Sequence, residues 1–399
     1  MMNKGHVYAV WSLFHGRGKK LEVIRHMVGD ILTFDEKTLT KRQGKSEIPL
    51  ATSNPYDPNT SPPDIMQYLP PDGTYFSLFS DPYAKMTYYM PKTGNNTARF
   101  WQGSRMENHS FTDSELKLLD FLSQHRCATR SQIARAVFAD TDNVYKIKDF
   151  ISKCHQRGII SAFSWKTPCA DGKKKPLIYG LTRVGAEVAE QLFHIRVPDR
   201  FKFHAVTFPN GAGPLMSHFY SHLTANEFFC QLKSIDRIVK WEREPHILLE
   251  DQTTFRPAFV AEVIKDAGDL KTLWIEPVRI TNGWYQRLIS RFREIQIGFD
   301  KVSTSLKPDR LILIVDSDSR IPMIGSLAEE HMPDVVLRFT TDERLLAGID
   351  KQTFLSNPVD GSLILSPIPF LLKDAQGMKA SEYLAHQVVE ITEDDFEDI

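Results

Sequence analysis

The sequence predicts an α+β protein built from several domains. Its 399 residues are enough for two or three domains of ordinary size. Residues 110–193 carry helical patterns followed by two strand-like stretches, and residues 215–345 mix strand-like and helical stretches. We expect a small β-containing domain over residues 1–105, which are rich in aromatic and turn-forming residues, and a C-terminal extension with an acidic tail over residues 346–399.

The composition is that of an ordinary globular protein, with 42% hydrophobic and 25% charged residues. The net charge of −1 does not by itself indicate a class of partner. Four cysteines occur without a C-x-x-C pair, which suits a reducing cytosol and argues against a zinc site. No apolar run approaches the roughly 18–20 residues that span a bilayer, and the first residues make a poor signal peptide. We expect a soluble, cytoplasmic protein without membrane contact.

The helical region begins with two capping boxes, in which a Thr is followed three residues later by Glu or Gln. Thr112-x-x-Glu115 and Thr129-x-x-Gln132 each precede apolar residues at helical spacing. A third helix is predicted from apolar residues at Val144, Ile147, Ile151 and Cys154, with Gly158 as its stop. The strand-like stretches IISAF (159–163) and LIYGL (177–181) follow, and a further helix begins near Arg183.

Three short helices followed by a two-stranded ribbon are the pattern of a winged helix-turn-helix. Residues 140–185 contain seven Lys and two Arg against four Asp and no Glu, so this region is basic. Lys and amide side chains read base edges, and Lys and Tyr hold phosphates. The expected DNA-binding residues here are Asn143, Tyr145, Lys146, Lys148 and Lys153 on the third helix and Lys173, Lys174 and Lys175 on the wing. The alternative is a winged helix that contacts protein.

The α/β region has the order helix, three strands, helix, strand, helix, strand, which matches the core of restriction-endonuclease-like folds. Two neighbouring strands there carry Glu262 and Glu276, and the strand before them carries Glu242 and Glu244. Carboxylates on adjacent strands hold divalent metals in nucleases. The helix after Glu276 carries Arg287 and Arg291 at i, i+4, where they are expected to contact phosphate or pair with Glu276 or Glu294.

Several landmarks resemble the replication-relaxation family of plasmid and mobile-element proteins, and the plan is similar to that of MobC-type mobilisation relaxases. They are Tyr179-Gly-Leu-Thr182-x-x-Gly185, a helix beginning with His218, paired strands with acids, and an apolar strand ending near Arg320. The resemblance covers roughly residues 110–345. It implies a winged helix followed by a restriction-endonuclease-like domain, and a role in replication, mobilisation or its regulation.

The family pattern implied by this resemblance has Pro-Asp on the first paired strand and Glu on the next, sometimes with a nearby Lys. Here Pro257 is followed by Ala258, and no Lys stands two residues after Glu276. A single carboxylate rarely holds Mg²⁺. We therefore expect a degenerate, non-cutting domain without a cofactor. The alternative is a Mg²⁺-dependent nickase that uses Glu276, Glu262 and Glu244 or Glu242.

A histidine pair and the acidic C-terminal segment are two further features of the sequence. His218 and His222 stand at i, i+4 and could pair on a metal, but packed or surface histidines are commoner, so no metal site is expected. The tail QVVEITEDDFEDI (387–399) is expected to be a disordered, solvated end. Its alternatives are a recruitment peptide for a replication or transfer protein, or a segment that occupies the chain's own DNA-binding groove. Double-stranded DNA is the main expected partner, and a homodimer is a further expectation.

Overall fold

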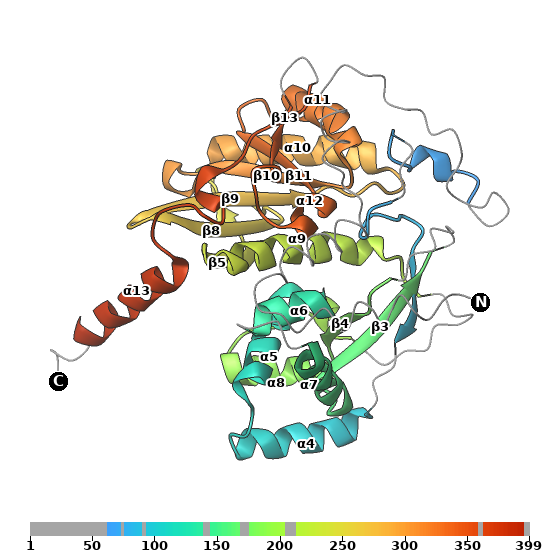
Figure 1. Cartoon of the computed structure of the whole chain (residues 1–399), viewed down its shortest axis with the longest axis vertical. Coiled ribbons are helices and arrows are strands. Elements are labelled where there is room, and N and C mark those ends of the chain that lie inside the picture. The colour runs from blue at the N-terminus through green and yellow to red at the C-terminus, as the bar shows by residue number, and fades with distance from the viewer. Residues whose placement is uncertain are drawn as a thin grey trace, which may run out of the picture.

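The computed structural model describes residues 62–72, 76–89, 93–138, 144–167, 175–203, 213–357 and 362–394. These residues form layers that combine helices with several sheets, as the predicted α+β class requires (Figure 1). Helices α10 and α11 lie on one face of a seven-stranded sheet, and α9 lies on the other face. Helices α4 to α8 and a four-stranded sheet lie beyond α9. No helix in these described ranges is long and apolar enough to cross a membrane.

The predicted order of three helices, two strands and a further helix is confirmed over residues 113–193. The elements are α5 (Asp113–His125), β2 (Cys127–Thr129), α6 (Arg130–Val137), α7 (Val144–Gln156), β3 (Ile160–Lys166), β4 (Ile178–Leu181) and α8 (Arg183–Phe193). The short strand β2 is not apparent in the sequence pattern, and neither is the preceding helix α4 (Asn95–Glu107). Both predicted capping boxes are formed, at Thr112 with Glu115 and at Thr129 with Gln132.

The four-stranded sheet is antiparallel and has the order β1-β3-β4-β2. Strand β1 (Lys85–Tyr89) comes from the region expected to form an N-terminal domain, and it pairs with β3. Upstream of β1, a 3-10 turn, η2 (Ile65–Gln67), packs with Tyr68, Leu69 and Phe76 against Ile280 of the α/β region. Residues 65–72 and 76–89 therefore contact both the unit that contains the four-stranded sheet and the α/β region.

The α/β region follows the predicted order of elements. It begins with α9 (Ser217–Ser234), after a 3-10 turn η3 (Asp199–Phe201), and its seven-stranded sheet has the order β13-β12-β11-β10-β9-β8-β5. The elements are β5 (Ile238–Arg243), β6 (Ile247–Leu248), β7 (Thr254–Phe255), β8 (Phe259–Asp266), β9 (Asp269–Pro277), α10 (Trp284–Lys301), η5 (Thr304–Leu306), β10 (Arg310–Val315), η6 (Asp318–Arg320), α11 (Ile321–His331), β11 (Leu337–Thr341) and α12 (Asp342–Ala347).

Side-chain alternation along β8, β9 and β10 gives the sheet two apolar faces. Val260, Trp274 and Leu313 pack toward α10 and α11, whereas Ala261 and Ile275 pack toward α9. Strands β9, β10 and β11 are parallel, so their carboxyl ends meet at one edge of the sheet. Strands β5, β8, β12 and β13 pair antiparallel with their neighbours.

Helices α4 to α8 and the four-stranded sheet together are called the helical unit. Helix α9 joins this helical unit to the seven-stranded sheet through buried polar contacts. His125 of α5 shares a 2.8 Å hydrogen bond with Asn226 of α9. Gln132 of α6 donates to the carbonyl oxygen of Leu223, and Arg135 of α6 forms an ion pair of 2.6 Å with Glu227. These buried, directional contacts are satisfied in one arrangement of the two units, and a shifted arrangement would leave buried polar groups without partners. The helical unit is therefore held in a fixed orientation on the sheet.

The C-terminal extension adds strands to the sheet and ends in a helix. Strands β12 (Leu355–Ser356) and β13 (Ile364–Leu365) extend the sheet edge, and η7 (Pro369–Leu371) covers the α9 face. Helix α13 (Ala380–Asp394) projects from the body (Figure 1). The prediction of a disordered tail is wrong for residues 387–394, which continue helix α13. Residues 395–399 lie outside the described ranges.

Candidate nucleic-acid interface

Helix α7 presents a basic outer face. Its buried side is Ile147, Ile151 and Cys154, as the apolar pattern predicted. The predicted binding residues Tyr145, Lys146, Lys148 and Lys153 are all exposed, and Tyr145 is 64% exposed. One acid, Asp149, shares this face. The face therefore offers three ammonium groups and a phenol against one carboxylate, which suits contact with phosphates.

One predicted core position on α7 is wrong. Val144 is 52% exposed, although the helical spacing placed it on the buried stripe. It is the first residue of the helix, and the buried side of α7 begins only at Ile147. An exposed apolar residue beside Tyr145 adds an apolar contact surface to the basic face.

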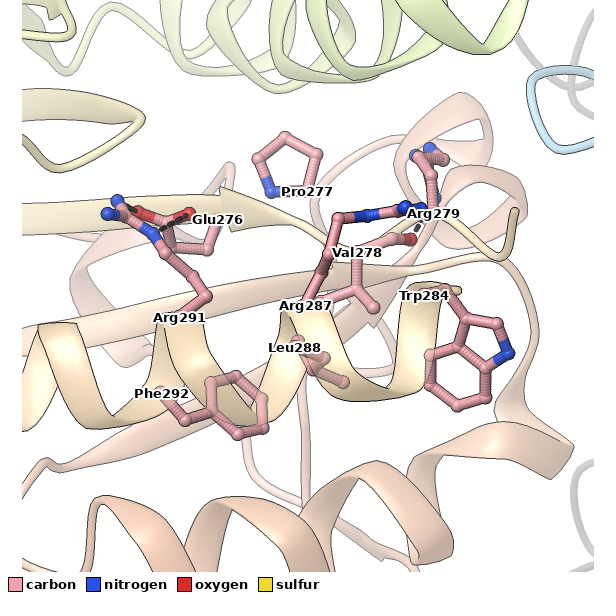
Figure 2. Close-up of a pocket in the computed structure, with 9 residues that line it drawn as sticks. All are labelled: Glu276, Pro277, Val278, Arg279, Trp284, Arg287, Leu288, Arg291 and Phe292. Atoms are coloured by element: carbon pink, nitrogen blue, oxygen red, sulfur yellow. Dashed lines mark hydrogen bonds and ion pairs between the residues drawn. The ribbon is translucent and has the colours of Figure 1, made fainter. Parts of the chain in front are cut away.

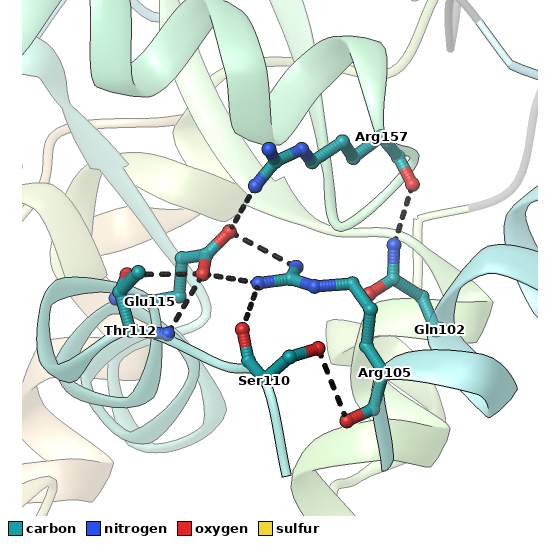
Figure 3. Close-up of polar contacts among 6 residues, drawn as sticks. All are labelled: Gln102, Arg105, Ser110, Thr112, Glu115 and Arg157. Atoms are coloured by element: carbon teal, nitrogen blue, oxygen red, sulfur yellow. Dashed lines mark hydrogen bonds and ion pairs between the residues drawn. The ribbon is translucent and has the colours of Figure 1, made fainter. Parts of the chain in front are cut away.

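The end of α7 is anchored by a buried carboxylate (Figure 3). Glu115, whose side chain is 3% exposed, accepts from Arg105 of α4 and from Arg157, which follows α7, at 2.5 and 2.9 Å. It also closes the capping box by accepting from the backbone N–H of Thr112. Burial raises the pKa of Glu115, but the hydrogen bonds from Arg105 and Thr112 outweigh it, and the net pKa is lowered. One ionised carboxylate thus ties α4, α5 and α7 together.

The landmark Tyr179-Gly-Leu-Thr-x-x-Gly185 has a structural explanation. The Thr182 hydroxyl caps α8 by accepting from the Gly185 N–H at 2.9 Å and donates to the carbonyl oxygen of Gly158 at 2.6 Å. A Cβ on Gly180 would lie 2.2 Å from the Phe203 ring, and a Cβ on Gly185 would lie 2.1 Å from the Ile159 carbonyl oxygen. Both glycines permit close packing of β4 and α8, so this landmark belongs to the scaffold.

The expected wing is only partly described. Strands β3 and β4 form an antiparallel pair, and Lys175 lies half-buried before β4. Asn143, Lys173 and Lys174 lie outside the described residues, so their predicted DNA contacts stay predictions.

Glu276, the central carboxylate of the nuclease-like prediction, is enclosed by positive and polar groups (Figure 2). Arg291 of α10 donates to it at 2.5 Å, and the backbone N–H of Ala258 donates to it at 2.8 Å. Burial disfavours the charged guanidinium, but the charge and hydrogen bonds of Glu276 and Glu294 raise the pKa of Arg291. The two glutamates therefore stabilise the positive charge of Arg291 beside the end of β9.

The other predicted carboxylates do not join Glu276. Glu262 is paired with Thr272, four residues before Glu276 on β9, which corresponds to about 13 Å along the strand. Glu244 is directed to Arg200, at 2.5 Å, and Glu242 to Lys240, at 3.2 Å. Within the described ranges, no group of three or more His, Cys, Asp or Glu is arranged to hold a metal ion.

The two predicted metal histidines have different environments. His218 is exposed, whereas His222 is buried. Burial, followed by the nearby charges of Arg126 and Arg243, lowers the pKa of His222 to about 2. His222 packs edge-on against Phe201 and Phe259. It is therefore a neutral packing residue in the interface between the helical unit and the sheet.

Arg287 and Arg291 border a pocket of about 150 Å³ at the end of β9 (Figure 2). The remaining lining residues are Glu276, Pro277, Val278, Arg279, Trp284, Leu288 and Phe292. The Arg287 guanidinium donates to the Thr281 hydroxyl at 2.5 Å. The structure thus brings the two predicted arginines together with Arg279, which lies two residues after β9.

A buried polar network at the carboxyl edge of the parallel strands was not foreseen. Arg279 forms an ion pair of 2.5 Å with Asp342, which follows β11, and Arg320 forms one of 2.9 Å with Asp316, which follows β10. Burial raises the pKa of Asp316, even though Arg320 lies beside it. One sequence signal could have predicted this network. An Asp directly follows each of the strands β10 and β11, and the carboxyl ends of parallel strands meet at one edge of a sheet.

Comparison with known proteins gives one family match. A family model described as replication-relaxation matches residues 119–316, from α5 through β10. The matched residues contain α6, α7, the glycine landmark and the paired strands with Glu276. No curated protein and no solved structure matches the chain.

Proposed function

Because the chain belongs to the replication-relaxation family, we propose that it is a DNA-binding protein that acts in the replication or mobilisation of a plasmid or other mobile element, or in its regulation. The family resemblance predicted from the sequence is confirmed by the match over residues 119–316. The proposal assigns DNA contact to the helical unit and assigns a non-catalytic, nuclease-like role to the seven-stranded sheet.

The helical unit is proposed to be a winged helix-turn-helix. Helices α6 and α7 would form the helix-turn-helix, and β3 with β4 would form the wing. The observation that carries the proposal is the exposed face of α7, where Tyr145, Lys146, Lys148 and Lys153 surround one acid. A helix of this size fits the major groove, where Lys side chains reach phosphates and base edges. The anchor at Glu115 supports it by fixing the orientation of α7.

The seven-stranded sheet is proposed to have a restriction-endonuclease-like fold that has lost its chemistry. Supporting this, the Ala258 N–H donates to Glu276, so the family pattern's Asp position lies beside the remaining carboxylate. Arg291 neutralises that carboxylate from α10. Metal-dependent hydrolysis needs anionic ligands for the ion, and a cation in this place opposes metal binding. The sheet is therefore proposed to act as a platform for DNA.

The test compares two double variants in duplex binding. Lys146→Ala/Lys148→Ala removes two charges from α7. Lys351→Ala/Lys373→Ala is the matched control, because these exposed lysines lie on the other unit. Fluorescence anisotropy with a mixed-sequence duplex is measured at several salt concentrations. The α7 variant is expected to lower affinity and to reduce the slope of log K against log salt by about 1.8, at about 0.9 per phosphate contact. Equal slopes for both variants would contradict DNA binding by α7.

A further inference from the structure

The pocket at the end of β9 contains arginine groups that its own carboxylates do not satisfy. Within the described residues, no carboxylate lies within ion-pair distance of Arg287, which is exposed at the pocket rim. The Arg279 side chain is only 6% exposed, and its Nε–H lacks a hydrogen-bond partner among the described residues. Its terminal nitrogens donate to Asp342 and Thr224, so Arg279 is a fixed part of the pocket wall, and the accessible guanidinium is that of Arg287.

The first turn of α10 borders the same pocket. Trp284 and Arg287 both line it, and the N-cap residue Gly283 offers no side chain to cap the helix. The Trp284 N–H already donates to the Thr281 carbonyl oxygen at 3.0 Å, but the positive end of the helix dipole still favours an anion there. Glu276 also lines the pocket, but Arg291 neutralises it. An anion would meet Arg287 and the first turn of α10, with Arg279 in the pocket wall.

Aromatic side chains flank this anion position. Trp284 is half-buried at the pocket wall, and Tyr285 beside it is 42% exposed, with ring centroids 5.7 Å apart. An arginine beside a partly exposed Trp and an exposed Tyr is a combination that binds single-stranded nucleic acid, where the arginine holds phosphate and an aromatic ring stacks on a base. A duplex keeps its base faces stacked and cannot offer them to the rings. The occupant is therefore an unpaired strand.

We infer that the pocket formed by Arg279, Trp284 and Arg287 binds a phosphate of single-stranded DNA, with the adjoining base against Trp284. The inference rests on the proposed DNA-binding function and extends it. The helical unit would bind duplex, and the degenerate sheet would hold a strand separated from that duplex. Arginines would then hold phosphate at the position where a nuclease uses a metal ion.

The experiment measures binding of a labelled oligothymidylate of twelve nucleotides to the full chain. Arg287→Ala is compared with Arg293→Ala, an exposed arginine on the same helix that lines a different pocket. Arg287→Ala is expected to lower the affinity about tenfold, and Arg293→Ala by less than about twofold. An oligomer of equal length with abasic sites is expected to bind the wild-type chain more weakly, because it keeps the phosphates and lacks the bases.

Equal losses for the two arginine variants, or no binding of the oligothymidylate by the wild-type chain, would overturn the inference. The same samples are titrated with duplex, and Lys146→Ala/Lys148→Ala is included. If that variant loses duplex binding while both arginine variants behave alike, the proposed function stands and the pocket inference fails. If Arg287→Ala alone changes oligothymidylate binding and the α7 variant leaves duplex affinity unchanged, the pocket stands and the proposed role of α7 fails.

Discussion

Arg291 of α10 donates to Glu276 of β9 at 2.5 Å, so a cation from the helix that follows β9 neutralises the carboxylate at the end of that strand. The Glu276 side chain is 10% exposed, and that of Arg291 is 25% exposed. Arg291 also donates to the Arg256 carbonyl oxygen, in the loop that precedes β8. The pair therefore links α10, β9 and the loop before β8, and it neutralises the Glu276 carboxylate.

Removing Arg291 is expected to destabilise the fold. Arg291→Ala leaves Glu276 buried with only the Ala258 N–H, and the free energy of unfolding should fall by about 2 kcal/mol, less than for a fully buried pair because Arg291 is partly exposed. Glu276→Gln keeps a hydrogen-bonding group and should cost less. Denaturant unfolding of both variants measures this. An Arg291→Ala protein as stable as the wild type would show that the pair does not support the sheet.

The glycine landmark is predicted to be a packing requirement. Gly185→Ala places a Cβ 2.1 Å from the Ile159 carbonyl oxygen, so the free energy of unfolding should fall by about 3 kcal/mol. The matched control is Gly103→Ala in α4, where the added Cβ meets no atom within 4 Å. This control should gain about 0.5–1 kcal/mol from helix propensity. Thermal unfolding of the two variants is the measurement, and similar melting temperatures would contradict the explanation.

Two buried histidines are predicted to make the fold acid-sensitive. Burial lowers the pKa of His125 to about 3 and that of His222 to about 2, against about 6.5 in the unfolded chain. Above pH 6.5 both histidines are neutral in either state and contribute no pH dependence. Between pH 6.5 and about 3 the unfolded chain binds more protons than the folded chain. As the pH is lowered through this range, the free energy of unfolding therefore falls by up to about 1.4 kcal/mol per pH unit for each histidine.

The acid sensitivity is checked by chemical unfolding at pH 7 and pH 5. In His125→Gln the free energy of unfolding should change less between pH 7 and pH 5, by about the contribution of one histidine. The substitution removes one of the two buried groups whose protonation is disfavoured in the folded state. His218→Gln is the matched control, since His218 is exposed on the same helix as His222. A pH dependence that is unchanged in His125→Gln would show that other groups control the acid response.

Local patterns in the sequence predicted much of the secondary structure of the helical unit. They could not predict contacts between residues that are distant in the sequence. The capping boxes at Thr112 and Thr129 fix the starts of α5 and α6 because both partners lie within four residues. Helix α4 lacks such a cap and follows Gly94, so nothing local marked its start. The pairing of Glu276 with Arg291 was one predicted option, because the helix directly follows its strand.

The network around Arg279 could not be predicted from local pattern. Its partner Asp342 is 63 residues away and becomes a neighbour only because β9, β10 and β11 run parallel. The exposure of Val144 was also not predictable from local pattern. Helical spacing does not reveal which end of a helix lacks a packing partner. The basic face of α7 was predictable, because the buried stripe leaves its lysines outward.

The most direct test of binding without cleavage uses supercoiled plasmid incubated with the purified chain at several salt concentrations, with and without Mg²⁺ or Mn²⁺. Electrophoresis reports the mobility shift and nicking together. We predict a shift that weakens as salt rises and no metal-dependent nicking, because Arg291 occupies the Glu276 site. Metal-dependent nicking that is lost in Glu276→Ala would contradict this account and make the strand pair an active site.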